Sequence, residues 1–152
     1  MKLTDVLTKE RIIINLHGKD KCDVLKKLVN VAKTSGKVTD EVDLLKKVIE
    51  RENIKSTGIG GGIAIPHAQT SGVTDIIACL GISEQGIEFN SLDDKLVHLV
   101  FLIATKERTN STYLGLLSRI ARLFIDESFK QRIIKSTSPE EIMNLILGKE
   151  KE

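Results

Sequence analysis

Residues that can do chemistry gather in the stretch TGIGGGIAIPHA, residues 57–68, where four of the chain's eleven glycines precede a single histidine, His67. A neutral imidazole can attack phosphorus, and the resulting phosphohistidine keeps a high transfer potential, so one histidine suffices for phosphoryl transfer. Backbone N–H groups in glycine-permitted conformations, together with neutral hydroxyls, can hold the negative charge of a phosphoryl group. The stretch therefore predicts a phosphoryl acceptor at His67. The residues predicted to cradle the phosphoryl group are Ser56, Thr57, Gly58, Gly60, Gly61 and Gly62.

Two other interpretations of the same stretch are considered. The dinucleotide fingerprint fails because Ile63 stands where its third glycine belongs, and no GK[ST] follows, so nucleotide binding is disfavoured. The local pattern also fits a hairpin turn at residues 60–62, followed by a strand that ends at Pro66 with a surface histidine. That alternative stays open on local pattern alone.

The residues around His67 carry two further expectations. Pro66 fixes its own φ and biases the preceding residue toward an extended conformation, so His67 follows a stiff strand end. The apolar residues around the histidine predict a flat surface on which a partner protein can dock. These residues are Ile59, Ile63, Ile65 and Ala68.

Composition favours one globular domain, residues 1–148, with a frayed tail at 149–152. The 23 basic and 21 acidic residues give a net charge of +2, which does not indicate nucleic-acid binding or a membrane surface. The N-terminus has no signal-peptide core and no apolar run is long enough to span a membrane, so we expect a cytoplasmic protein. Cys22 and Cys79 lie in separate apolar segments, and we expect both to be buried, reduced thiols.

The first half of the chain predicts a strand at 11–16 and two amphipathic helices, one from Asp20 to Gly36 and one over 40–52. The apolar stripe expected on the second helix consists of Val42, Leu45, Val48 and Ile49. Nearly continuous apolar runs at 74–82 and 96–104 suit strands that are covered on both faces. Between them, the alternation of Ile87 and Phe89 suggests a short edge strand.

The second half predicts three helices. The first begins at Asn110 or Ser111 and extends to residue 124, the second covers 126–134, and the last begins at a capping box that starts with Ser138. The order of elements predicts an α/β domain with a central mixed sheet of about five strands sandwiched by helices.

The segment TGIGGGIAIPHA resembles the active-site segment of the fructose/mannitol-type (type-2) enzyme IIA (EIIA) domains of the bacterial phosphoenolpyruvate-dependent sugar phosphotransferase system. That family includes the nitrogen-regulatory IIA proteins. Further segments fall in family order, namely REN at 51–53, GIEFNSLDDKLVHLVFLIAT at 86–105, YLGLLSRIARLF at 113–124 and SPEEIMNLI at 138–146. The resemblance thus covers most of the chain and implies the EIIA fold.

The resemblance implies that His67 accepts a phosphoryl group from an HPr-type histidine carrier protein, on its tele (Nε2) nitrogen. His67 then passes the group to an EIIB domain, or holds it as a mark that switches binding to regulatory target proteins. No cofactor and no metal are implied. A chain that ends just after its last helix favours the regulatory branch slightly. Neither the residues nor the resemblance identifies a sugar.

Two further residues are assigned by the resemblance. Arg51 stands where such domains place an arginine that neutralises phosphoryl charge, and the alternative is a surface ion pair with Glu50 or Glu52. Many members carry a second histidine where this sequence has Tyr113. The tyrosine hydroxyl can donate a hydrogen bond to a phosphoryl oxygen, or the ring can serve as a core aromatic.

The two remaining histidines are expected to be structural. His98 lies in an apolar strand and predicts a ring whose hydrogen bonds are satisfied within the fold, while His17 lies in a turn and predicts a solvated ring. No spacing of the three histidines supports a metal site.

Overall fold

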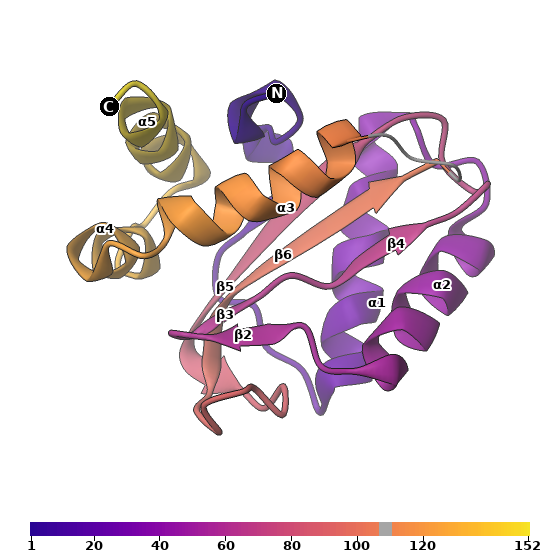
Figure 1. Ribbon diagram of the computed structural model, residues 1–152, viewed down its shortest axis with the longest axis horizontal. Coiled ribbons are helices and arrows are strands. Elements are labelled where there is room, and N and C mark those ends of the chain that lie inside the picture. The colour runs from indigo at the N-terminus through magenta and orange to yellow at the C-terminus, as the bar shows by residue number, and fades with distance from the viewer. Residues whose placement is uncertain (107–110) are drawn as a thin grey trace.

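The computed structural model describes residues 1–106 and 111–152 and shows one mixed β-sheet between two layers of helices (Figure 1). In the described residues the sheet has six strands. Five follow the order β1-β5-β6-β3-β2, and the sixth, β4, pairs with β6 on the same edge as β3 but farther along the strand, at Ile103–Thr105. The strands are β1 (Ile12–Ile13), β2 (Gly58–Gly60), β3 (Ile63–Ala64), β4 (His67–Gln69), β5 (Ile77–Ile87) and β6 (Val97–Thr105). This confirms the predicted mixed sheet, with one strand more than the expected five or so.

Helices cover both faces of the sheet (Figure 1). On one face lie α1 (Lys21–Ala32) and α2 (Glu41–Ile54); on the other lie α3 (Ser111–Leu123), α4 (Glu127–Ile134), α5 (Pro139–Glu150) and the N-terminal turns. Short 3-10 helices occur at Leu3–Asp5, Lys9–Arg11 and Lys33–Ser35. The predicted Asn110 start of α3 lies outside the described residues.

Three helix starts follow from the sequence, because the predicted caps at Asp20, Asp40 and Ser138 each make a hydrogen bond. The Asp20 carboxylate accepts a hydrogen bond from the N–H of Asp23 at 2.8 Å, and Asp40 accepts one from Asp43 at 3.0 Å. Ser138 Oγ accepts one from the N–H of Glu141 at 3.2 Å. These bonds satisfy N–H groups that have no partner within the helix. The reciprocal half of the predicted capping box is not formed, since the Glu141 carboxylate accepts from the N–H of Thr137 rather than from that of Ser138.

The core is divided in two by the central strand β6, as its continuous apolar sequence predicts. Successive side chains of a strand point to opposite faces. Leu99, Phe101 and Ile103 therefore pack under α3, α4 and α5, while Val100, Leu102 and Ala104 pack under α1 and α2. Burial of both faces explains why the strand lacks polar alternation.

Strand boundaries differ from the expectations in two places. The strand predicted at 11–16 is only Ile12–Ile13, because Asn15 adopts a left-handed conformation with φ of 61° that cannot continue a strand. The separate edge strand predicted around Ile87 is wrong, since β5 extends through Gly86, whose φ is 92°, to Ile87, with an irregularity in its pairing with β6 between Ile82 and Ile87.

Burial differs from the expectations in three places. Val42 is 76% exposed, because the buried side of α2 consists of Leu44, Val48 and Glu52, spaced four residues apart. Cys22 is exposed in the first turn of α1, whose buried stripe begins only at Val24. Cys79 is buried as predicted, and burial raises the pKa of its thiol to about 12. Both cysteines are free thiols.

The chain ends differ as well. Helix α5 extends to Glu150, and the Glu150 side chain is only 1% exposed, so the frayed tail expected from residue 149 starts later. None of the helices in the described parts of the chain combines the length and the apolar character that spanning a membrane requires.

Candidate phosphoryl-transfer site

The central strand fixes the position of His67. Strands β3 and β4 both pair in parallel with β6, and the Ile65–Pro66 step lies between them. Because proline has no N–H, pairing is interrupted there, but the Pro66 carbonyl still accepts a hydrogen bond from the N–H of Ile103 at 3.0 Å. His67 begins β4 opposite Ile103. The imidazole is therefore carried by a backbone that is anchored to the middle of the sheet.

One hydrogen bond determines which ring nitrogen of His67 is nucleophilic. Nδ1 lies 2.7 Å from the carbonyl oxygen of Ile65. A carbonyl can only accept, so Nδ1 carries the proton and donates it. The lone pair of the neutral ring is then on Nε2, the nitrogen on which phosphorylation was predicted.

The surroundings of His67 favour its neutral form. Burial of the half-buried ring lowers the pKa of His67 below its ordinary value of 6.5, and the nearby charge of Arg51 lowers it further. The hydrogen bond to Ile65 and the charge of Glu52 act in the opposite direction. Because the net shift is downward, the ring is uncharged at neutral pH, as a nucleophile must be.

His67 borders two surface hollows of about 380 and 370 Å³. Arg51 and Leu117 also line both hollows, so these two residues lie near the His67 ring. The first is also lined by Lys55, Ser56, Thr57, Gly58, Ile59, Ile65, Leu92, Ser118 and Ala121. The second is also lined by Lys47, Glu50, Ile54, Ala68, Gln69, Tyr113 and Leu114. Positive charge therefore lies in the walls of both hollows, from Arg51 in each, Lys55 in the first and Lys47 in the second.

Arg51 lies in the last turn of α2 and lines the wall of both hollows. Its Nη1 donates a hydrogen bond to the carbonyl oxygen of Lys55 at 2.8 Å. The alternative ion pair is not present in the described residues, since Glu50 pairs with Lys46 and Glu52 pairs with Lys21. The structure thus brings Arg51 to His67.

Only part of the predicted cradle reaches this site. Ser56, Thr57 and Gly58 line the first hollow, but their polar groups already have partners. Ser56 Oγ donates to the Phe89 carbonyl and accepts from the N–H of Gly58. The Thr57 hydroxyl donates to Glu52 at 2.6 Å.

The other three glycines lie elsewhere. Gly60 ends β2, and Gly61 and Gly62 form the turn of the β2–β3 hairpin. The φ values of the three are 95°, 65° and 81°, and none of them lines either hollow. The N–H of Gly61 donates to Asp93 at 3.0 Å, and the Gly61 carbonyl accepts from Lys130. This is the hairpin turn of the alternative interpretation.

Tyr113 is a core aromatic that also lies beside His67, so its two predicted roles do not exclude each other. Its side chain belongs to the core under α3 and is 2% exposed, while its ring lies 6.1 Å from the His67 ring, edge on. Burial raises the pKa of the Tyr113 hydroxyl, which is therefore protonated at neutral pH and able to donate.

Exposed apolar side chains surround the two hollows, and we call them the apolar rim. The rim consists of Ile54, Ile59, Leu92 and Leu114, which are 80%, 42%, 67% and 63% exposed. Of the residues predicted to form a flat approach, only Ile59 belongs to the rim. Ile63, Ile65 and Ala68 are buried in the two core layers beside β6, although Ile65 and Ala68 also line the hollows.

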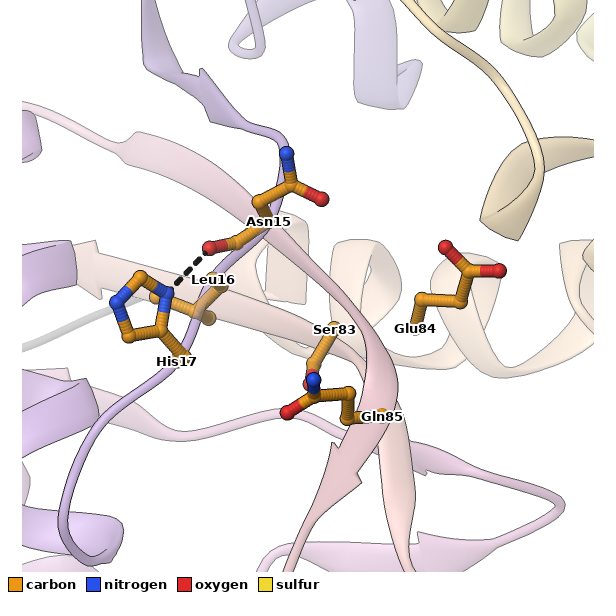
Figure 2. Close-up of a pocket in the computed structure, with 6 residues that line it drawn as sticks. All are labelled: Asn15, Leu16, His17, Ser83, Glu84 and Gln85. Atoms are coloured by element: carbon orange, nitrogen blue, oxygen red, sulfur yellow. Dashed lines mark hydrogen bonds between the residues drawn. The ribbon is translucent and has the colours of Figure 1, made fainter.

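The remaining histidines lie away from this site. His98 donates from Nδ1 to the Ser83 carbonyl at 2.9 Å, which confirms a satisfied strand residue. His17 is exposed and borders a larger hollow of about 630 Å³ (Figure 2). That hollow contains none of the predicted site residues. Among the described residues, no three His, Cys, Asp or Glu side chains form a group able to hold a metal ion.

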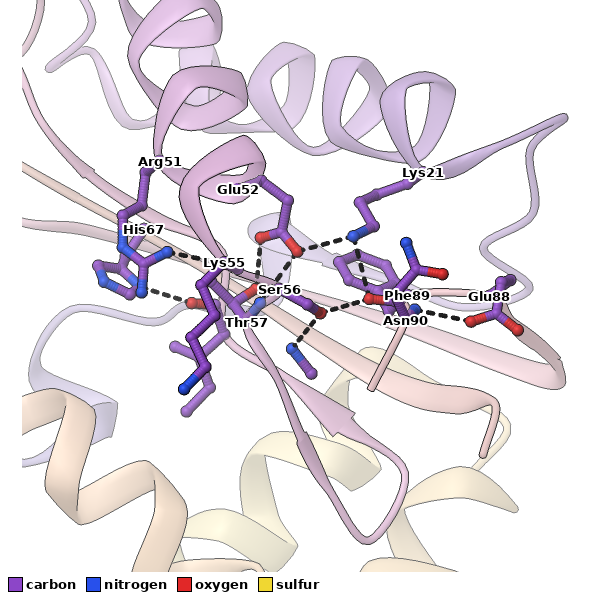
Figure 3. A network of polar contacts seen from close by, with 12 residues as sticks. Lys21, Arg51, Glu52, Lys55, Ser56, Thr57, His67, Glu88, Phe89 and Asn90 are labelled. Carbon is purple, nitrogen blue, oxygen red and sulfur yellow. Dashed lines mark hydrogen bonds and ion pairs between the residues drawn. The ribbon is translucent and has the colours of Figure 1, made fainter. Parts of the chain in front are cut away.

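Sequence reasoning missed two charged residues beside the site, Glu52 and Lys21 (Figure 3). Glu52 is buried at the end of α2, where it pairs with Lys21 from α1 at 3.0 Å and accepts hydrogen bonds from Thr57. The available signal was spacing, because Glu52 continues the buried series of Leu44 and Val48 at intervals of four residues.

Comparison with known proteins adds a family assignment. Residues 5–149 match the model of the family described as "Phosphoenolpyruvate-dependent sugar phosphotransferase system, EIIA 2". The fructose-specific EIIABC component of Bacillus subtilis is 38% identical over 96% of this chain, which spans only 23% of that longer protein. The nitrogen regulatory protein of Pseudomonas aeruginosa is 27% identical over 97% of this chain and 96% of its own length.

Solved structures share the fold. The nitrogen regulatory protein IIA-Ntr from Neisseria meningitidis superimposes with a TM-score of 0.86 at 23% identity, covering 93% of this chain and 97% of that one. The IIA chain in a complex of enzyme IIAMTL with phosphorylated enzyme IIBMTL from Escherichia coli gives a TM-score of 0.81 at 21% identity, covering 93% and 97%. At these identities the likeness shows the fold alone.

Proposed function

Because this chain belongs to the EIIA 2 family of the phosphoenolpyruvate-dependent sugar phosphotransferase system, we propose that it is a phosphocarrier whose acceptor atom is Nε2 of His67. The observation that carries this proposal is the hydrogen bond from Nδ1 to the Ile65 carbonyl, which leaves the lone pair on Nε2. The lowered pKa of His67 supports it, since the ring is neutral when a donor arrives.

The transfer step needs no group beyond the two reacting histidines and the phosphoryl group. The Nε2 lone pair forms a new N–P bond while the N–P bond to the donor's imidazole breaks, and the donor ring leaves as a neutral base. The guanidinium of Arg51 offsets part of the charge on the phosphoryl oxygens. Tyr113 donates a hydrogen bond to one of those oxygens. The proposed cradle at Ser56, Thr57 and Gly58 requires the groups that now satisfy one another to exchange partners.

The apolar rim supports partner proteins as donor and acceptor. Ile54 and Leu114 border one hollow, and Ile59 and Leu92 border the other, so a partner that covers the rim also covers His67. We propose an HPr-type histidine carrier as the donor. An EIIB domain is the acceptor, by analogy with the IIA–IIB complex among the solved structures. We place this relay in the cytoplasm.

A phosphorylation assay tests the proposal. The chain is incubated with phosphoenolpyruvate, enzyme I and the HPr-type carrier, and its intact mass is measured. We expect one added phosphoryl group that is labile in acid and stable in base, and none on His67→Ala. Equal labelling of His67→Ala would assign the acceptor to another residue.

A second candidate is regulation, in which phosphorylation at His67 switches binding to target proteins. It is favoured by the similarity to nitrogen regulatory proteins over nearly their full length. A pull-down that compares the phosphorylated and unphosphorylated chain separates the two candidates. Transfer onward to an EIIB domain supports the relay, whereas a target captured by one form only supports regulation.

A further inference from the structure

A charge pair with a buried carboxylate, Glu52 and Lys21, lies beside the phosphoryl-transfer site, next to Thr57 (Figure 3). The Glu52 side chain is 3% exposed and the Lys21 side chain 21% exposed, with 3.0 Å between Oε1 and Nζ. Burying a carboxylate costs free energy unless charges and hydrogen bonds compensate for lost water. The position of Glu52 continues the apolar side of α2, where an aliphatic residue would also be buried. The charge therefore calls for an explanation beyond packing.

The contacts of Glu52 converge on Thr57, in the loop that leads to His67. Oε1 accepts a hydrogen bond from the backbone N–H of Thr57 at 3.0 Å, and Oε2 accepts one from its hydroxyl at 2.6 Å. Two bonds to one residue fix both its position and its rotation. Thr57 follows the end of α2 by three residues.

Hydrogen bonds continue from Thr57 to the imidazole. The Thr57 carbonyl accepts from the N–H of Ile65 at 3.1 Å, and the Ile65 carbonyl accepts from Nδ1 of His67 at 2.7 Å. Each link uses the backbone of the next residue, so a displacement of Thr57 displaces the carbonyl that selects the tautomer of His67.

We propose that Glu52, held in place by Lys21, is a positioning residue that fixes the orientation and tautomer of His67 through Thr57 and Ile65. The inference rests on the proposed function of His67 and assigns the residue that keeps Nε2 ready for attack. It parallels the way in which second-layer partners orient histidine ligands in metal sites by bonding to the other ring nitrogen.

Lys21 also contacts Phe89, which connects the Glu52–Lys21 pair to the segment after β5. Its ammonium also donates to the Phe89 carbonyl at 3.0 Å and lies 5.0 Å from the centre of the Phe89 ring. The same carbonyl accepts from Ser56 Oγ. Lys21 at the start of α1 therefore contacts both Glu52 at the end of α2 and Phe89 in the segment after β5. Ser56, which precedes the β2–β3 hairpin, bonds to the same Phe89 carbonyl.

Two substitutions at Glu52 separate positioning from packing. Glu52→Gln keeps an amide oxygen that can accept from the N–H of Thr57, whereas Glu52→Leu keeps the volume and removes every acceptor. Glu41→Leu is the matched control, because it makes the same change at an exposed residue of the same helix. If Glu52→Leu fails to fold, Lys21→Met/Glu52→Leu removes the unpaired ammonium as well.

Each variant is measured in two ways. Long-range ¹H–¹⁵N correlation spectra of the neutral imidazole report the tautomer of His67, and the assay with the histidine carrier reports the phosphorylation rate. We expect Glu52→Leu, or the double variant, to show mixed tautomers and a rate lower by about tenfold to a hundredfold. Glu52→Gln and Glu41→Leu should retain the Nδ1-protonated ring and most of the rate.

A folded Glu52→Leu or double variant that keeps the single tautomer and the wild-type rate would overturn the inference. The spectra need no phosphoryl donor, so they decide the positioning role separately from the proposed function. A wild-type chain that shows the Nδ1-protonated ring but is never phosphorylated would contradict the function and leave the positioning result intact.

Discussion

At the scale of single residues, the chemistry of the site follows from the different roles of the two ring nitrogens of His67. His67 donates from Nδ1 to the Ile65 carbonyl, which leaves the lone pair on Nε2, and burial lowers the pKa of the ring so that the neutral form is favoured. The charge of Arg51 lowers the pKa of His67 as well, and in the proposed function the same guanidinium offsets phosphoryl charge after transfer.

The pH dependence of His67 can be measured directly. We expect the imidazole to titrate in NMR spectra with a midpoint below 6.5, and to return to about that value in urea. Between the two midpoints the unfolded chain binds more protons, so stability contributed by the neutral ring is lost as the pH falls below 6.5. A folded midpoint above 6.5 would show that burial does not dominate.

Tyr113 is tested by removing its hydroxyl alone. Tyr113→Phe keeps the buried ring, so we expect the free energy of unfolding to fall by no more than about 1.5 kcal/mol. The lifetime of the phosphohistidine should shorten by up to about tenfold, the equivalent of one hydrogen bond. Tyr113→Ala is the packing control, with an expected loss of about 3–5 kcal/mol in urea unfolding. An unchanged lifetime in Tyr113→Phe would make the residue a core aromatic only.

At the scale of elements, the β2–β3 hairpin separates two groups of glycines with different roles. A Cβ on Gly58 would lie 2.3 Å from Ser91 Oγ and 3.0 Å from its Cα, so close packing requires glycine there. A Cβ on Gly60 meets nothing nearer than 3.4 Å, and glycine is required by its φ of 95° instead.

Substitutions in the hairpin should therefore have different consequences. We expect Gly60→Ala to cost about 1–3 kcal/mol of stability while the phosphorylation rate changes little, because the turn lies outside the hollows. Gly58→Ala should slow phosphorylation severalfold, because the backbone that lines the hollow must move. Urea unfolding and carrier-dependent phosphorylation are measured for both. If Gly60→Ala kept its stability but was phosphorylated slowly, Gly60 would be assigned to the phosphoryl cradle after all.

Elements were predictable where one local rule determines them. The capped starts at Asp20, Asp40 and Ser138 and the two-sided burial of β6 needed only neighbouring residues. The end of β1 depended on the left-handed Asn15, and the length of β5 on an irregular pairing with β6 that includes the positive φ of Gly86. Neither feature is visible in hydrophobic periodicity.

The same distinction applies to the site. His67 could be found from its segment, because Pro66 and the strand end are local features. Glu52 and Lys21 could not be paired from sequence, since they are 31 residues apart and meet only when α1 packs on α2. It could likewise not be predicted that Gly58 lines a hollow while residues 60–62 do not, because this depends on how the β2–β3 hairpin pairs with β6.

At the scale of the whole molecule, the two ends of the chain close the layer opposite α1 and α2. The buried carboxylate of Glu150 accepts hydrogen bonds from the N–H groups of Leu3 and Thr4 at 2.7 and 3.1 Å, and from the Thr4 hydroxyl at 2.7 Å. The last turn of α5 therefore caps the first turn of the chain.

Shortening the chain tests this closure. Deletion of residues 149–152 removes the acceptor for two backbone N–H groups, so we expect a loss of about 1–3 kcal/mol in the free energy of unfolding. Deletion of residues 151–152 alone should change little, since both are exposed. Phosphorylation at saturating donor should survive in both, because Glu150 does not line the His67 hollows. Equal stability of the two truncated chains would show that Glu150 contributes nothing measurable.

The position of the phosphoryl group on the imidazole is the most direct test of the account. The chain is labelled with ¹⁵N-histidine, phosphorylated through the histidine carrier, and its ring nitrogens are assigned by NMR. The account predicts a phosphoryl group on Nε2 of His67, with Nδ1 still protonated and bonded to Ile65. A phosphoryl group on Nδ1, or on any residue other than His67, would contradict it.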